Sequence, residues 1–149
     1  MANTSGKRIQ RSSDKELLLN ALKEKGLFKE FYGVLIFAAL LGFQEKKRVK
    51  LISPDSGKAI DQTVFGNCGA WPGILHLMSL VETGNSDTLS SSSEQEEKRI
   101  TIFQEYANGG LEIMQEYFSK TSITLDNLLG LIDRYNNDPE RMPFIGVTI

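Results

Sequence analysis

The fold is decided by the stretch Arg99-Ile-Thr-Ile-Phe-Gln-Glu-Tyr-Ala-Asn-Gly-Gly-Leu-Glu-Ile-Met-Gln-Glu-Tyr-Phe118. Its apolar residues recur at helical spacing and form one stripe, made of Phe103, Tyr106, Ala107, Gly110, Met114 and Tyr117. At its centre, Gly109 and Gly110 indicate either a helix break or a point where another helix approaches the backbone closely. We therefore predict a long packed helix here, and we interpret the glycine pair as structural rather than as a ligand-binding loop.

Four further helices are predicted around this stretch. A capping box at Ser13–Glu16 indicates a helix that ends at Gly26. The segment Leu27–Gly42 predicts a helix that is apolar on nearly every side and therefore lies in the centre of the domain. Residues 74–83 and 125–135 predict the remaining two. The expected fold class is mainly α, a compact single-domain bundle of about five helices.

The segment between the second and third predicted helices leaves two alternatives open. Val49–Ile52 and Lys58–Phe65 flank a turn signal, Pro54-Asp-Ser-Gly57, which favours a short β-hairpin. A loop followed by a helical turn fits nearly as well.

The ends of the chain and one internal tract differ from the rest in composition. Residues 1–12 are small, polar and basic, so we expect a disordered basic arm ahead of a helical domain over residues 13–149. Residues 85–97 are rich in serine and glutamate and are expected to form a flexible polar linker. The apolar end, Met142–Ile149, is expected to dock on the body or on a partner in extended form.

Composition bounds the class of protein. A chain of 149 residues with 40% hydrophobic and 24% charged residues is typical of one water-soluble domain that needs no disulfide cross-links. Cys68 is the only cysteine, so no internal disulfide can form and a reducing cytoplasm is the expected compartment. The most apolar run, Leu35–Phe43, is too short to span a bilayer, and we expect no membrane association.

Charge is distributed unevenly along the chain. Residues 1–50 hold eleven Lys and Arg against five Asp and Glu, about +6, while residues 51–149 hold six against fourteen, about −8. A basic half can form a binding surface for DNA phosphates. The candidate phosphate-binding residues are Lys7, Arg8, Arg11, Lys46, Lys47, Arg48 and Lys50. The simpler interpretation, which we favour, is that the two halves attract each other.

No motif indicates catalysis, a cofactor or a metal site. His76 is the only histidine and lies in an apolar helical segment, so a structural role is far more common than a catalytic or metal-binding one. Cys68 has no second cysteine and no nucleophile signature around it. The segment Gly66–Gly69 lacks the spacing of a phosphate-binding loop. An enzyme, nuclease-like and using carboxylates such as Glu105 and Glu112, is the least supported class of function.

Two segments carry a resemblance to a known family. Phe37-Ala-Ala-Leu-Leu-Gly-Phe43, followed by the basic cluster, and Ile102-Phe-Gln-Glu-Tyr-Ala-Asn-Gly-Gly-Leu-Glu112 resemble marker segments of the small bacterial proteins associated with DNA phosphorothioation (Dnd) systems. The resemblance covers most of the chain from Phe28 to Leu131, and the second segment is the more distinctive one. It carries over no catalytic residue. It does imply a special segment, serving packing or partner contact, at Tyr106, Asn108, Gly109, Gly110 and Glu112.

The resemblance implies an accessory role in sulfur modification of the DNA backbone or in restriction of unmodified DNA, which is a phage defence. Our leading hypothesis is a non-enzymatic component that contacts other proteins of such a system. The alternative is a protein that binds DNA directly through its basic N-terminal half.

Overall fold

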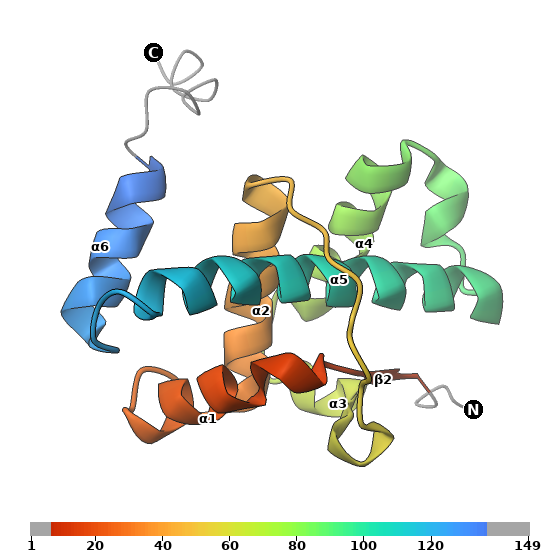
Figure 1. Cartoon of the computed structure of the whole chain (residues 1–149). Coiled ribbons are helices and arrows are strands. Elements are labelled where there is room, and N and C mark those ends of the chain that lie inside the picture. The colour runs from red at the N-terminus through yellow and green to blue at the C-terminus, as the bar shows by residue number, and fades with distance from the viewer. Residues whose placement is uncertain (1–6, 137–149) are drawn as a thin grey trace, which may run out of the picture.

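A long helix, α5 (Ser93–Phe118), runs through the whole molecule, and α2 (Phe31–Gln44) crosses it near its middle (Figure 1). The structure is a computed structural model and describes residues 7–136. As its composition predicts, α2 lies at the centre. Its buried residues are Val34, Leu35, Ile36, Ala38, Ala39, Leu41 and Gly42.

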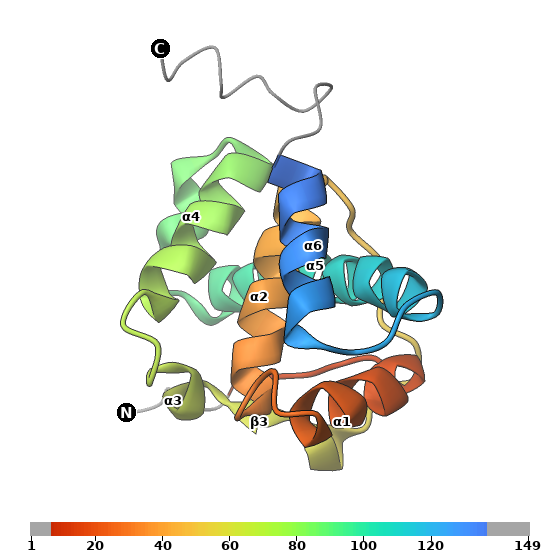
Figure 2. The same cartoon turned by 90° about the vertical axis from the view of Figure 1, so that its left-hand side faces the viewer.

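Four more α-helices lie around this pair: α1 (Glu16–Glu24), the single-turn α3 (Gln62–Phe65), α4 (Trp71–Thr83) and α6 (Leu125–Asn136). Three short 3-10 helices join them: η1 (Ser13–Lys15), η2 (Ser56–Lys58) and η3 (Ser86–Leu89). Both views place α2 between α4 and α6 (Figures 1 and 2). The mainly helical fold class is confirmed, with six α-helices within residues 7–136 where about five were expected.

Three glycines allow the backbones of α2 and α5 to touch. A β-carbon added to Gly110 would lie 1.8 Å from the carbonyl oxygen of Ala38, and one added to Gly42 would lie 2.1 Å from a carbonyl oxygen of α5. A β-carbon on Gly109 would lie 1.9 Å from the carbonyl oxygen of Lys47, just beyond the end of α2. Any other residue type would force the two backbones apart. The glycine pair of α5 therefore marks a close helix contact, and α5 continues through it without a break.

Gly42 does not end α2, contrary to the sequence prediction. The helix begins at Phe31, continues to Gln44, and is closed at Lys46, whose φ is 56°. The Lys47 N–H then donates to the Gly42 carbonyl oxygen at 2.8 Å. A helix end and a close helix contact both favour glycine, so the residue type alone could not distinguish them.

Aromatic rings fill the space between α3, α4 and α5. The centroid of the Trp71 ring lies 4.5 Å from that of Phe65 and 4.9 Å from that of Phe103, and all three side chains are buried. Such pairs contribute about 0.5–1.5 kcal/mol each beyond the area that they bury. The connection between α3 and α4 is thus anchored at both of its ends.

The N-terminal segment is part of the fold from residue 7 onward, which corrects the expectation of a disordered arm for residues 7–12. Arg8–Ile9 forms strand β2, and the Ile9 side chain is 1% exposed. Ile9 is the only apolar residue in this stretch, so no hydrophobic periodicity could indicate the strand. Residues 1–6 lie outside the described residues.

A short antiparallel ladder is present, but it joins distant parts of the chain. Strand β3 (Ile60–Asp61) comes from the segment in which a strand was expected. Its partner is β2, with Arg8 opposite Asp61 and Ile9 opposite Ile60, and not Val49–Ile52.

Residues 85–97, expected to be a flexible linker, contain η3 and the first turn of α5. Ser92 caps α5, its hydroxyl oxygen accepting a hydrogen bond from a backbone N–H of the first turn. The buried guanidinium of Arg99 donates to the carbonyl oxygens of Thr88 and Ser90, both at 2.7 Å. Composition could not reveal this order, because the residue that holds the segment, Arg99, lies farther along the chain in α5.

The capping box predicted at Ser13–Glu16 is not formed. The Ser13 hydroxyl donates to the Ile52 carbonyl oxygen at 2.9 Å, and the Glu16 carboxylate accepts from Arg11 at 2.6 Å. The predicted end of the helix is confirmed, since Gly26 follows it with a φ of 80°. Both polar side chains of the motif therefore bind residues outside the motif.

Two further expectations concern membranes and the C-terminus. Among residues 7–136, no helix combines the length and apolarity that crossing a membrane requires. The apolar segment Met142–Ile149 lies outside the described residues.

Gly42→Ala is expected to destabilise the protein strongly, by on the order of 3 kcal/mol, because the new β-carbon meets the backbone of α5 and neither helix can move without repacking the core. Chemical denaturation measures the loss. The matched control is Gly33→Ala in the same helix, where the nearest atom outside the helix backbone would lie 3.8 Å away. That variant should be neutral or stabilised by up to about 1 kcal/mol, from helix propensity alone. Equal stabilities for the two variants would contradict the close contact.

Candidate functional site

The basic cluster of the sequence lies on an extended segment that we call the strap, Lys46–Ile52. It leaves the end of α2, passes over α5 and reaches η1 (Figure 1). The Val49 N–H donates to the carbonyl oxygen of Glu105 in α5 at 3.0 Å, and the Ile52 N–H donates to the Ser12 hydroxyl at 2.7 Å. The strap therefore connects α2 and α5 to the N-terminal segment.

Asn108 holds the middle of the strap. Its side-chain amide nitrogen donates to the carbonyl oxygens of Val49 at 3.3 Å and of Lys50 at 3.0 Å. The residue is 2% exposed, and its side-chain oxygen has no hydrogen-bond partner in the structure. Only a donor suits this position between two carbonyls, so asparagine fits where aspartate would not.

Arg48 connects three elements through two carboxylates. Its Nη1 lies 2.6 Å from a carboxylate oxygen of Glu82 at the end of α4, and its Nε lies 2.8 Å from one of Glu105 in α5. The Tyr106 hydroxyl donates a short hydrogen bond to the other oxygen of Glu82. The Tyr106 ring packs edge-on against Phe43 of α2, with centroids 5.3 Å apart.

The charge states of this network are fixed by its own contacts. Partial burial and the hydrogen bond to Glu82 raise the pKa of the Tyr106 hydroxyl to about 12. The same hydrogen bond, with help from Arg48, lowers the pKa of the Glu82 carboxyl below its usual value. Partial burial opposes the charge of Arg48, but hydrogen bonds to Glu82 and Glu105 outweigh it and raise its pKa. The network thus holds the Arg48 cation, the Glu82 carboxylate and a neutral Tyr106 phenol across the neutral pH range.

Glu112 forms a second link between the strap and α5. Its carboxylate lies 3.2 Å from the ammonium of Lys47 and 3.8 Å from that of Lys15 in η1. Lys15, whose side chain is 1% exposed, also pairs with Asp14 at 3.1 Å. A buried ammonium is tolerated only with such partners.

The structure thus places all five residues of the predicted special segment in contacts with α2, α4, η1 or the strap. Tyr106 and Glu112 contribute polar side chains, Asn108 binds the strap carbonyls, and Gly109 and Gly110 allow the close approach. Sequence reasoning missed Glu82 and Lys15. Glu82 lies far along the chain from Arg48 and Tyr106, and Lys15 lies far from Glu112, so no local pattern links them.

The predicted phosphate-binding cations are divided among more than one cleft. Lys7 and Arg8 line a cleft of about 510 Å³ beside α5, whereas Arg48 lines a different one near the start of α5. Several of these cations are already paired: Lys7 with Glu97 at 3.1 Å, Arg11 with Glu16 at 2.6 Å, Lys47 with Glu112, and Arg48 with Glu82 and Glu105. Arg11 is buried, with its guanidinium 4.6 Å from the Phe31 ring centroid.

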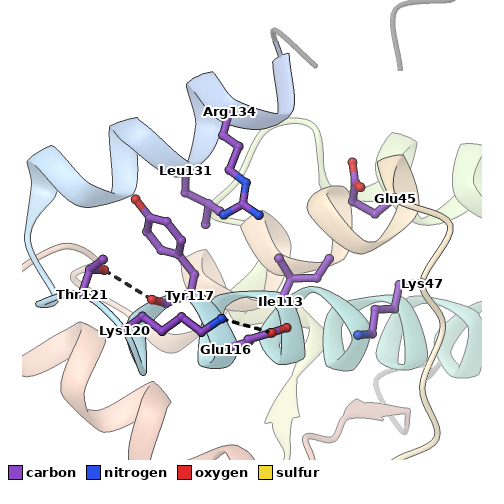
Figure 3. A pocket seen from close by; sticks show the side chains of 9 residues that line it. All are labelled: Glu45, Lys47, Ile113, Glu116, Tyr117, Lys120, Thr121, Leu131 and Arg134. Carbon is purple, nitrogen blue, oxygen red and sulfur yellow. Dashed lines mark hydrogen bonds and ion pairs between the residues drawn. The ribbon is translucent and has the colours of Figure 1, made fainter. Parts of the chain in front are cut away.

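A cleft of about 400 Å³ lies between α5, α6 and the start of the strap (Figure 3). Its walls carry charges of both signs, from Glu45, Lys47, Glu116, Lys120 and Arg134. Glu116 and Lys120 pair with each other at 3.8 Å. Such a mixed lining suits no single class of charged ligand.

The remaining candidates for chemistry have structural surroundings. A ring nitrogen of His76, Nδ1, lies 2.7 Å from the carbonyl oxygen of Pro72 one turn earlier in α4. Cys68 is a free, half-buried thiol. Within the described part of the chain, no group of three or more potential metal ligands comes together.

Fold and site together define a small, mainly helical protein whose basic segment is bound by its own acidic helix residues. The chain belongs to the family of DNA sulphur modification system-associated protein 4, whose sequence model matches residues 8–143. This confirms the resemblance noted in the sequence. No curated protein and no solved structure matches the chain.

Tyr106 should ionise late, with a pKa of about 12, when the folded protein is titrated with base. Its neutral form is favoured by folding, so the stability that it contributes is present below pH 10.0, the ordinary value, and is lost as the pH rises toward about 12. Ultraviolet titration of tyrosinate should show a late step that Tyr106→Phe removes. Tyr32→Phe, a matched loss of one phenol, should leave that step in place. A late step that survives in Tyr106→Phe would contradict the assignment.

Proposed function

We propose that this chain is an accessory, non-enzymatic component of a bacterial DNA sulphur modification system and acts through contacts with other proteins of that system. Its family is named for association with such a system. In this proposal the protein works in the cytoplasm and serves modification of the DNA backbone or restriction of unmodified DNA, as a phage defence.

The observation that carries the proposal is the internal use of the basic half. Arg48, Lys47 and Arg11 are all held by carboxylates of the same chain. A cation that already has a partner at 2.6–3.2 Å gains little by moving to a phosphate, since one ion pair replaces another. This favours a structural role for these cations over a phosphate-binding one.

Exposed apolar side chains support protein contacts in addition. The large hydrophobic residues with exposed side chains include Leu17, Leu77, Val81, Leu125 and Leu129. Burying apolar side chains against a protein partner stabilises a complex, whereas contact with a DNA backbone does not.

Affinity purification of the tagged chain, expressed at its native level and from nuclease-treated lysate, tests the proposal. We expect enrichment of other DNA sulphur modification proteins over an unrelated tagged protein of equal abundance. Nuclease treatment removes co-purification through shared DNA, so contacts that survive it are protein contacts. If no protein of that system is enriched, the proposal is wrong.

The alternative, direct DNA binding, is supported by Lys46 and Lys50. Both are exposed and, among the described residues, neither has an ion-pair partner, unlike Arg48 between them. Two neighbouring free cations on an extended segment can contact phosphates.

A DNA shift assay across a salt series decides between the two functions. Because the free cations are few, we expect no shift, or at most a weak one, at about 150 mM salt. Lys46→Glu with Lys50→Glu should then behave like Lys25→Glu with Lys29→Glu, a control with the same change of net charge at exposed sites beyond α1. Tight binding that falls steeply with salt and is lost only in the first variant would establish the alternative instead.

A further inference from the structure

The cleft between α5, α6 and the start of the strap has an apolar floor and charged walls. Ile113 and Tyr117 of α5 and Leu131 of α6 supply the apolar part, and all three belong to the core or pack against it. Figure 3 shows Ile113 in the middle of the lining, with Arg134 on one side and Glu116 on the other. A lining of this kind can hold a peptide segment whose apolar side chains lie on the floor and whose charged ones meet the walls.

One ion pair on the walls is weak enough to be exchanged. Glu116 and Lys120 lie 3.8 Å apart, and each side chain is 74% exposed, so their contact contributes little to stability. Both side chains can therefore take a new partner at small cost. A ligand with charges of a single sign would meet like charges in this cleft, whereas a ligand that carries both signs finds a partner for each.

The segment that follows α6, residues 137–149, has the composition that this cleft accepts. Asp138, Glu140 and Arg141 carry both signs of charge within four residues, and an apolar stretch follows from Met142 onward. The whole segment lies outside the described residues. Charges of both signs beside apolar side chains are the same combination that lines the cleft.

The segment begins close enough to the cleft to reach it. Arg134, which lines the cleft, lies two residues before the end of α6 at Asn136. Five extended residues, such as 137–141, span up to about 17 Å, which is about three turns of a helix. Met142 and the apolar residues after it are therefore within reach of the floor.

We infer that the cleft binds segment 137–149 of the same chain, with Phe144 and Ile145 on the apolar floor beside Ile113 and the charged residues along the walls. Pro139 disfavours a continued helix, so the chain is expected to leave the axis of α6. A segment joined to its site by a short connection has an effective concentration on the order of 1 mM there, so even a weak contact forms. A separate protein would need a similar concentration to compete, which favours the chain's own segment as the occupant.

NMR spectra of the backbone amides test the inference in the full chain. The variant carries both Phe144→Asp and Ile145→Asp, which place two carboxylates where apolar side chains meet the floor. Because this change removes the contact, the amide signals of Ile113, Tyr117 and Leu131 are expected to shift. Signals far from the cleft are expected to keep their positions, which also verifies that the variant is folded.

A control variant separates docking from a change of net charge. Lys25→Gln with Lys29→Gln makes the chain more negative by the same two charges, at exposed sites beyond α1. It should leave the amide signals of the cleft in place. Cleft signals that do not respond to the loss of Phe144 and Ile145 would overturn the inference, and so would a response confined to another surface, such as α4.

Disulfide trapping supplies a distance test of the same docking. In a Cys68→Ser background, Ile113→Cys with Phe144→Cys should form an intramolecular disulfide when dilute protein is oxidised with diamide. It should form at least about tenfold faster than in Leu77→Cys with Phe144→Cys, because docking holds the segment beside α5 and α6. Leu77 is 59% exposed, so a thiol there is accessible. Faster bridging to position 77 would overturn the inference, which is independent of the proposed function.

Discussion

The backbone contact between α2 and α5 is the constraint on which the rest of the structure depends. It exists because Gly42, Gly109 and Gly110 present no side chain where the helices cross. Glycine inside a helix costs about 1 kcal/mol of stability relative to alanine. Packing at the crossing must offset this cost at three positions. The close crossing buries seven of the fourteen residues of α2, and it lets the Lys47 carbonyl oxygen of the strap lie against the backbone at Gly109.

The charge asymmetry of the sequence is explained by this arrangement. The chain leaves α2 beside α5, so the basic residues that follow lie next to carboxylates that α5 and α4 already present. Arg48 joins α4 and α5, and Glu112 joins the strap and η1. Partly buried pairs of this kind are screened less by salt than surface pairs are. The basic and acidic halves thus attract each other within one chain, and several of the cations are paired inside it.

Sequence reasoning reached the helices because they depend on local periodicity, and it named a close helix approach as one of two interpretations of the glycine pair. It placed α2 at the centre, since an all-round apolar helix has no other stable position. It could not assign Gly42, because the same residue type serves a helix end and a helix contact. It also missed the fold of residues 7–12 and of residues 85–97, which are held by Ile60 and Arg99 respectively. Composition describes a segment alone, and these segments are ordered by residues elsewhere in the chain.

Residue-resolved hydrogen exchange of the native protein tests the central claim most directly. If the crossing holds the fold and the strap together, the amides of α2 and α5 around the three glycines exchange only through global unfolding. The Val49 amide, which donates to the Glu105 carbonyl oxygen, should exchange with the same free energy although it lies outside any helix. Exchange of Val49 at the rate of an exposed loop, or opening of the crossing well below the global unfolding free energy, would contradict the account.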